Sequence, residues 1–197
     1  MLRFVHAGVD AIVRMSATRT NYWLELAVDV ALGLGLIYAG LKADASRPVL
    51  SLMTIIFGLF AFSFIEYCFH RWLFHGRVPL FEQGHHAHHQ HPLGYDSLPF
   101  FLPPVVLLAL TGVFALVLPF ASACLMGGSI AFGYIIYGLS HFAIHHTRFR
   151  HPVVRQWAAR HHIHHHHPGH NFGVTTSLWD VVLRTRYVPA RKKPSAG

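Results

Sequence analysis

Histidine is the residue type that could do chemistry in this chain. There are 19 histidines, against 16 lysines and arginines together. They fall into four clusters, and two of these contain the spacing His-x-x-His-His. On a helix, residues at positions i, i+3 and i+4 share one face, so three imidazoles of such a unit can converge on one small volume. The units are His85, His88 and His89, and either His161, His164 and His165 or, one residue later, His162, His165 and His166.

The other two clusters adjoin apolar segments. His141 and His145 form an i, i+4 pair on one helix face. His70 and His75 are five residues apart, so we expect a helix end or a frayed turn between them. Neutral imidazole binds iron, zinc, copper or nickel. Four clusters supply enough histidines for two metal ions.

The set of donors favours a pair of iron ions. A structural zinc site closes with four ligands that usually include Cys, but both cysteines lie inside apolar stretches. Hydrolytic zinc pairs usually recruit Asp or Glu bridges, whereas an all-imidazole pair of irons suits oxygen activation. We expect zinc as the alternative occupant in purified samples. Glu66, one turn before His70, could orient the second ring nitrogen of that histidine, and Asp96 or Asp180 could do likewise; helix capping or a salt bridge is the alternative role for each.

Four apolar runs must position these clusters. Charged residues make up 12% of the chain and hydrophobic residues 53%, which excludes a disordered chain and argues against a soluble globule. The runs cover residues 22–41, 49–69, 97–118 and 119–140. Each is close to the roughly 20 helical residues that are needed to cross a bilayer. Because a proline favours a helix start, we expect a tight turn at Pro119. The sequence thus predicts an all-α fold, an integral membrane bundle of about four transmembrane helices with a histidine-rich cap; four buried helices of a soluble bundle are the alternative.

The basic residues predict the orientation in the membrane. Four spans place the N-terminus, the loop 70–96 and the tail 141–197 on one side of the membrane. Of the lysines and arginines, only Lys42 and Arg47 lie on the other side. The positive-inside rule assigns the shared side to the cytoplasm, and its loop and tail hold every histidine except His6. The net charge of +8 therefore indicates a membrane surface, and no nucleic-acid motif accompanies it. We expect a cytoplasmic lead over residues 1–21, the membrane domain over 22–187 and a basic tail over 188–197.

The clusters resemble the histidine boxes of the membrane fatty acid hydroxylase / sterol desaturase superfamily, over roughly residues 50–187. The phrase Asn171-Phe-Gly-Val-Thr-Thr-Ser-Leu-Trp-Asp180 is similar to that of the fatty acid 2-hydroxylases. The resemblance implies a di-iron oxidoreductase that hydroxylates a lipid acyl chain, at the 2-position in that subgroup, with O2 and external electrons. Counting back from Asn171 favours the earlier register of the last box. The metal ligands implied are His70, His75, His85, His88, His89, His141, His145, His161, His164 and His165, with His146 as an eleventh match.

The chain also departs from the eukaryotic 2-hydroxylases. Those often carry an N-terminal cytochrome b5 domain, whereas only about 20 residues precede the first span here, so we expect a separate electron donor such as cytochrome b5 or ferredoxin. Val182-Leu-Arg-Thr185 stands where Phe-Gly-Thr is common. A sterol or carotenoid hydroxylase or desaturase of the same superfamily is the alternative enzyme. A non-catalytic metal-binding membrane protein or metal transporter is the alternative of another class.

Overall fold

The longest apolar runs of the sequence become helices that are long and apolar enough to cross a membrane. In the computed structural model, which describes residues 2–189, these are α2 (Arg19–Ala43), α3 (Pro48–Cys68) with its continuation η1 (Phe69–Phe74), and α6 (Phe120–His146). A helix of 25 residues, such as α2, is about 37 Å long and exceeds the roughly 30 Å of a bilayer core. No strand occurs within residues 2–189, so the predicted all-helical membrane bundle is confirmed.

The third apolar run forms a shorter helix than the sequence predicts. Helix α5 (Leu102–Ala115) has 14 residues, which gives a length of only about 21 Å. It begins late because Asn21 holds the preceding residues in a loop. The Asn21 side chain donates to the carbonyl of Leu98 at 2.7 Å and accepts from the amide of Phe100 at 3.1 Å. The turn predicted at Pro119 is confirmed, since this residue immediately precedes α6.

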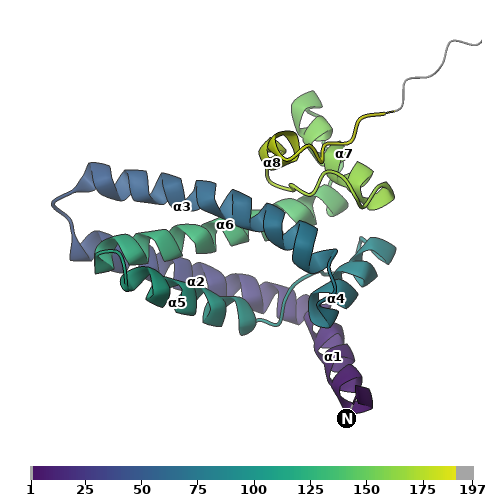
Figure 1. Ribbon diagram of the computed structural model, residues 1–197, viewed down its shortest axis with the longest axis horizontal. Coiled ribbons are helices and arrows are strands. Elements are labelled where there is room, and N and C mark those ends of the chain that lie inside the picture. The colour runs from purple at the N-terminus through teal and green to yellow at the C-terminus, as the bar shows by residue number, and fades with distance from the viewer. Residues whose placement is uncertain (1, 190–197) are drawn as a thin grey trace, which may run out of the picture.

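Helix α6 lies at the centre of the bundle and packs against α2, α3 and α5 (Figure 1). A side chain at Gly128 would place its Cβ 3.1 Å from the carbonyl oxygen of Gly33, so glycine there allows α2 and α6 to approach closely. On the other side of α6, Phe62, Met126 and Ile130 form the main apolar core. The outer face of α3 is apolar and exposed, at Leu52, Met53, Ile56, Phe57 and Phe60 among others, as expected of a surface that faces lipid.

The remaining helices form a cap at one end of the bundle (Figure 1). They are α4 (Pro79–Gln90), α7 (Pro152–His166) and the short α8 (Leu178–Val182), and α1 (Leu2–Ser16) lies at the same end. Proline occupies the start of α4 and of α7, where its missing amide hydrogen costs no helical bond. Most of the predicted basic tail, 188–197, lies outside the described residues. The cap therefore carries the histidine clusters of α4 and α7, and it lies at the end of the bundle where η1 and α6 carry the other two.

Candidate metal centre

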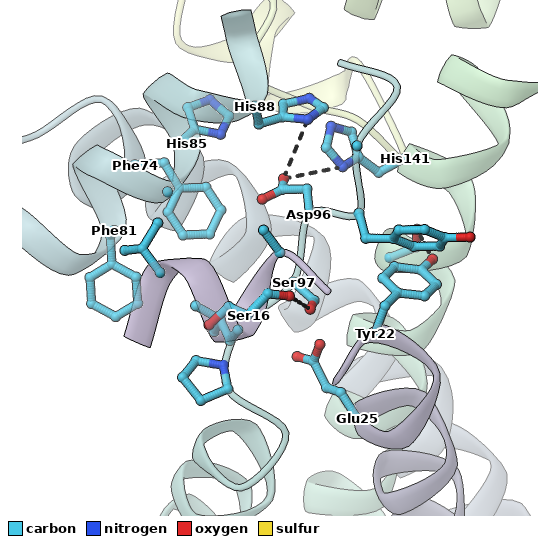
Figure 2. A pocket seen from close by; sticks show the side chains of 18 of the residues that line it. Ser16, Tyr22, Glu25, Phe74, Phe81, His85, His88, Asp96, Ser97 and His141 are labelled. Atoms are coloured by element: carbon cyan, nitrogen blue, oxygen red, sulfur yellow. Dashed lines mark hydrogen bonds and ion pairs between the residues drawn. The ribbon is translucent and has the colours of Figure 1, made fainter. Parts of the chain in front are cut away.

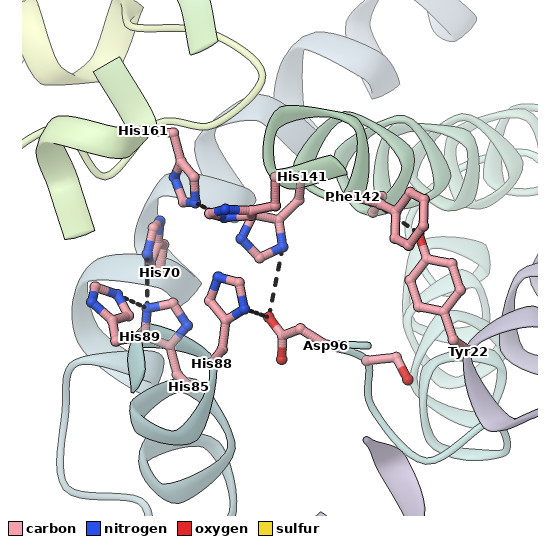
Figure 3. Close-up of polar contacts among 12 residues, drawn as sticks. Tyr22, His70, His85, His88, His89, Asp96, His141, Phe142 and His161 are labelled. Atoms are coloured by element: carbon pink, nitrogen blue, oxygen red, sulfur yellow. Dashed lines mark hydrogen bonds and ion pairs between the residues drawn. The ribbon is translucent and has the colours of Figure 1, made fainter. Parts of the chain in front are cut away.

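Ten imidazoles from α4, α6, α7 and the end of α3 gather into two groups between the cap and the bundle. Figure 3 shows part of this arrangement, with His70, His85 and His89 on one side and His88, His141 and His161 on the other. Within each group, one nitrogen from every ring lies within 4.8 Å of the corresponding nitrogens of the others. We call them the first group and the second group. The first group contains His70, His75, His85, His89 and His164, and the second contains His88, His141, His145, His161 and His165.

The eleventh predicted ligand, His146, lies outside both groups. Its ring stacks on Phe142 with centroids 3.9 Å apart. Its two nitrogens lie 2.9 and 3.2 Å from the carbonyl oxygens of Phe142 and Leu93. His162, the start of the alternative register of the last box, is exposed, whereas His161 is buried within the second group.

The two His-x-x-His-His units are each divided between the groups, which differs from the convergence expected from spacing. His85 and His89 enter the first group, while His88 enters the second. Helix geometry explains this division: at about 100° per residue, positions i and i+4 differ by about 40° and position i+3 lies about 60° to the opposite side. On α7, His164 enters the first group, whereas His161 and His165 enter the second. The groups adjoin where the rings of His89 and His165 stack, with centroids 4.2 Å apart.

A π-helical turn explains how His70 and His75 reach the same group. Residues 69–74 form η1, a π-helix, and the amide of His75 donates to the carbonyl of His70 at 3.2 Å. In such a turn the hydrogen bond joins residues five apart, so this spacing places both side chains on one face. Their rings stack with centroids 5.3 Å apart. The helix end expected between these residues is therefore present, since η1 ends at Phe74, and the turn that leads to it is wider than an α-helical one.

The first group has the hydrogen-bonding pattern of a metal site. The Nδ1 atoms of His70 and His164 donate to the carbonyls of Phe172 and His170, at 2.5 and 2.7 Å. Each Nε2 therefore presents a lone pair, because a neutral imidazole carries one N–H. Around His85, the Nε2 atoms of His70, His75 and His89 lie 3.1, 3.1 and 3.0 Å from its own Nε2. A single N–H cannot satisfy three neighbours, whereas one cation among the lone pairs would.

Buried nitrogens without partners mark the second group. Among residues 2–189, no hydrogen-bond partner faces His88 Nδ1, His141 Nε2 or His161 Nδ1. Buried polar atoms are rarely left unpaired. A metal ion would explain His141 Nε2, whereas His88 and His161 present Nε2 to the neighbouring imidazoles, so their unpartnered Nδ1 atoms lie on the other side of the rings. Burial, with neighbouring imidazoles, lowers the pKa of His88 and of His165 to about 2 in each case. The rings are thus neutral, which is the form that binds metals.

Asp96 lies beside two rings of the second group. Its Oδ2 atom is 3.6 Å from His141 Nδ1 and 3.9 Å from His88 Nδ1 (Figure 3). With Nδ1 turned toward the carboxylate, Nε2 of each ring turns toward the other imidazoles. A carboxylate on the far side of a ligating imidazole fixes its tautomer and orientation. Both distances are longer than a hydrogen bond, so Asp96 faces the two rings, and its orienting role stays a prediction.

Glu66 and Asp180 act on the first group through a loop rather than by direct contact. The carboxylate of Glu66 accepts from the amides of Val174 and Thr175, at 2.6 and 3.0 Å, and from the Thr175 hydroxyl. Asp180 accepts from the amides of Phe172 and Gly173, at 2.8 and 2.9 Å. The loop that they hold supplies the carbonyl that orients His70. Sequence reasoning missed this backbone acceptor, although the 171–180 phrase that it quoted is the loop itself.

A cavity of about 230 Å³ lies against the histidines (Figure 2). Its wall includes His88 and His141 of the second group and His85 of the first. The opposite parts come from α1, α2 and α6, and the apolar side chains Phe74 and Phe81 complete one side. A small ligand can therefore lie directly beside the imidazoles.

Comparisons with known proteins agree with this arrangement. The sequence profile of a family described as "Fatty acid hydroxylase" matches residues 55–185. A solved structure described as "Full length scs7p (only hydroxylase domain visible)" has the same fold: its TM-score is 0.77 at 24% sequence identity, over 90% of this chain and 70% of that one.

Two relatives are similar in sequence. "Dihydroceramide fatty acyl 2-hydroxylase FAH1" of Arabidopsis thaliana is 28% identical over 189 residues, which cover 90% of this chain and 77% of that protein. "Fatty acid 2-hydroxylase" of Homo sapiens is 31% identical over 142 residues, which cover 65% of this chain and 38% of that protein. The segment of this chain that matches the family profile contains all ten histidines of the two groups.

Proposed function

Because the chain belongs to the fatty acid hydroxylase family, we propose that it is a membrane-bound di-iron enzyme that hydroxylates a lipid acyl chain at the 2-position. The observation that carries the proposal is the pair of five-imidazole groups against one wall of a cavity. The names of the relatives favour acyl hydroxylation over the sterol and carotenoid alternatives. The grouped histidines lie in or directly after η1, in α4, in α7 and in the last turns of α6, at one end of the bundle rather than at its middle, which disfavours a transport site.

The proposed ligands are the ten histidines of the two groups. Iron bound there would supply the redox chemistry that activates O2. Imidazole nitrogen is a suitable ligand for iron. The protein itself performs three tasks. The carbonyls of Phe172 and His170 keep two rings in the ligating tautomer, Asp96 orients two more, and Phe74 and Phe81 keep one side of the cavity apolar.

The lipid substrate would reach the cavity from the membrane. Helices α1 and α2 form part of its wall, and α2 is one of the helices suited to crossing a bilayer. An acyl chain that enters between these helices leaves one apolar surrounding for another, so entry has little hydrophobic cost. The carbon to be oxidised would then lie beside His88 and His141.

The reaction also needs electrons, which we propose come from a separate protein such as cytochrome b5 or ferredoxin. The cap carries exposed arginines, including Arg148, Arg150 and Arg155, and they favour an acidic partner by electrostatic complementarity. The same basic residues support a cytoplasmic cap under the positive-inside rule. Labelling from outside intact cells tests the orientation: Ser46→Cys in the far turn should react with an impermeant thiol reagent, and Arg155→Cys should not.

Comparison of lipids from cells with and without the chain tests the proposed activity. Growth under ¹⁸O₂ should place one labelled hydroxyl on C2 of an acyl chain, and fragmentation mass spectrometry reads its position. A His88→Ala variant at the same membrane abundance should give no labelled product. Equal product from the variant, or no labelled lipid from wild-type cells supplied with either donor, would refute the proposal.

A further inference from the structure

Helix α8 turns its acid inward and its apolar side chains outward. The Asp180 carboxylate is 1% exposed and accepts from the amide of Phe172 and the hydroxyl of Thr185, at 2.8 and 2.7 Å. The outward side chains are apolar and 38% to 56% exposed, and they are Leu178, Val181, Val182 and Leu183. A helix on a water-facing surface shows the opposite arrangement, with its charged residues outside. The outer face of α8 is therefore suited to an apolar surrounding.

This face adjoins the surface of α3 that faces lipid. The indole ring of Trp179 packs on Phe64 and Phe60, with ring centroids 4.6 and 5.6 Å apart. Its Nε1 atom donates to the hydroxyl of Ser63 at 3.0 Å. Phe60 and Phe64 are themselves partly exposed, and Figure 1 shows α8 beside the half of α3 that leads to the cap. The apolar outer faces of α8 and α3 are thus continuous.

The contacts along α3 give the depth of α8 in a bilayer. Phe60 and Phe64 lie about 18 and 24 Å along the helix axis from Pro48, the first residue of α3. With Pro48 at the opposite boundary, both lie inside a hydrocarbon core of roughly 30 Å. Beyond α8, the hydroxyl of Thr185 is 3.0 Å from that of Tyr67, which lies about 28 Å from the same end. The chain therefore leaves the core near Thr185.

Arg184 and Arg186 flank Thr185 at the level of the lipid head groups. Both are exposed, and neither forms an ion pair with an acid within residues 2–189. Basic side chains at this level are attracted to lipid phosphates, and tryptophan is enriched at the same boundary. An acidic soluble partner would match the arginines but would leave the apolar face of α8 uncovered. Apolar residues below basic ones match a phospholipid leaflet.

We propose that α8 is inserted in the leaflet on the cap side of the membrane, with its exposed apolar side chains among the acyl chains and with Arg184 and Arg186 at the phosphate groups. The occupant of this surface is phospholipid. The proposal adds a membrane contact to those of the helices that cross the bilayer, and it does not depend on the reaction. The inner face of the same helix holds, through Asp180, the loop that orients His70. The leaflet therefore supports the first group of imidazoles.

Photolabelling of the wild-type holoprotein tests the insertion without any variant. The protein is placed in nanodiscs of phosphatidylcholine and phosphatidylserine that contain a phosphatidylcholine with a diazirine in one acyl chain. Fragmentation mass spectrometry then locates the adducts. Residues 178–183 should carry adducts, as should Phe57 on the outer face of α3, whereas Gln156, which is exposed on α7, should carry none. Adducts at Phe57 without any on α8 would overturn the proposal, and this outcome includes a second protein surface that covers α8.

Two substitutions at Val182, which is 56% exposed, distinguish contact with lipid from contact with water. A lysine can extend its ammonium group to the phosphates, whereas an aspartate at this depth leaves its charge in hydrocarbon. Val182→Lys should keep the wild-type melting temperature in nanodiscs. Val182→Asp should lower it and should lose metal to a chelator about tenfold faster, because α8 must leave the lipid and the loop is then free to move.

On a water-facing surface both substitutions would be tolerated. Equal responses of the two variants, whether both mild or both severe, would therefore overturn the proposal. Neither readout requires turnover. Lipid adducts on α8 together with an absence of hydroxylated product would refute the proposed function and leave the insertion of α8 standing.

Discussion

The carbonyl oxygen of Phe172 lies 2.5 Å from Nδ1 of His70 and accepts its hydrogen. This bond joins the loop after α7 to the end of α3, two segments far apart in the chain. His70 is 1% exposed, so its ring has no freedom to adopt another orientation. The geometry of the first group therefore depends on the loop as much as on the helices.

Asp180→Asn should loosen this loop. The carboxylate of Asp180 accepts from the amides of Phe172 and Gly173, and an amide side chain would turn one N–H₂ group toward a donor. We expect a loss of about 2 kcal/mol in the free energy of unfolding, the usual cost of a buried charge-assisted hydrogen bond. Faster loss of metal to a chelator should accompany it. Glu82→Gln, on the surface, is the control; equal metal retention in the two variants would contradict the role given to the loop.

His161→Ala and His162→Ala test the register of the last histidine box with adjacent residues. His161 is buried in the second group, whereas His162 is exposed. Only the first substitution should lower the metal content and abolish hydroxylation, because only this ring reaches the other imidazoles. Metal analysis and product yield are compared at equal protein in the membrane fraction. Loss of activity in His162→Ala alone would move the box by one residue.

Gly76→Ala should disturb the π-helical turn. A Cβ at this position would lie 1.9 Å from the carbonyl oxygen of Trp72, so the end of η1 must open and His75 must move. Overpacking of this kind typically costs about 1–3 kcal/mol. Thermal unfolding and metal content measure the effect. Gly35→Ala, on α2, meets no atom within 4 Å and should be neutral or stabilising, so a similar loss there would show that the effect is not specific to the turn.

Metal removal should lower the melting temperature of the whole bundle. Without a cation, the lone pairs around His85 face one another at 3.0 to 3.1 Å, and a metal that binds only the folded chain stabilises it by linkage. Differential scanning fluorimetry with and without chelator measures the change, and added Fe(II) should restore the original value. A Lys42→Ala variant, altered at the far end, should show the same decrease. An unchanged melting temperature after complete removal would argue against a structural contribution from the two groups.

The sequence predicts the helices and the histidine clusters well, because both depend on local spacing. Apolar runs of membrane length indicate α2, α3 and α6, and Pro119 marks the start of the last. The shortened α5 could not be predicted, since it results from bonds that Asn21 makes to residues distant in sequence. The role of Phe172 was equally hidden, because any residue type can supply a backbone carbonyl.

The division of each His-x-x-His-His unit couples the two groups mechanically. Helix α4 contributes His85 and His89 to the first group and His88 to the second. Helix α7 contributes one histidine to the first group and two to the second. Neither helix can shift without misplacing ligands of both groups. Occupancy of the pair should consequently be all or none, and a half-filled centre should be too short-lived to accumulate during assembly or demetallation.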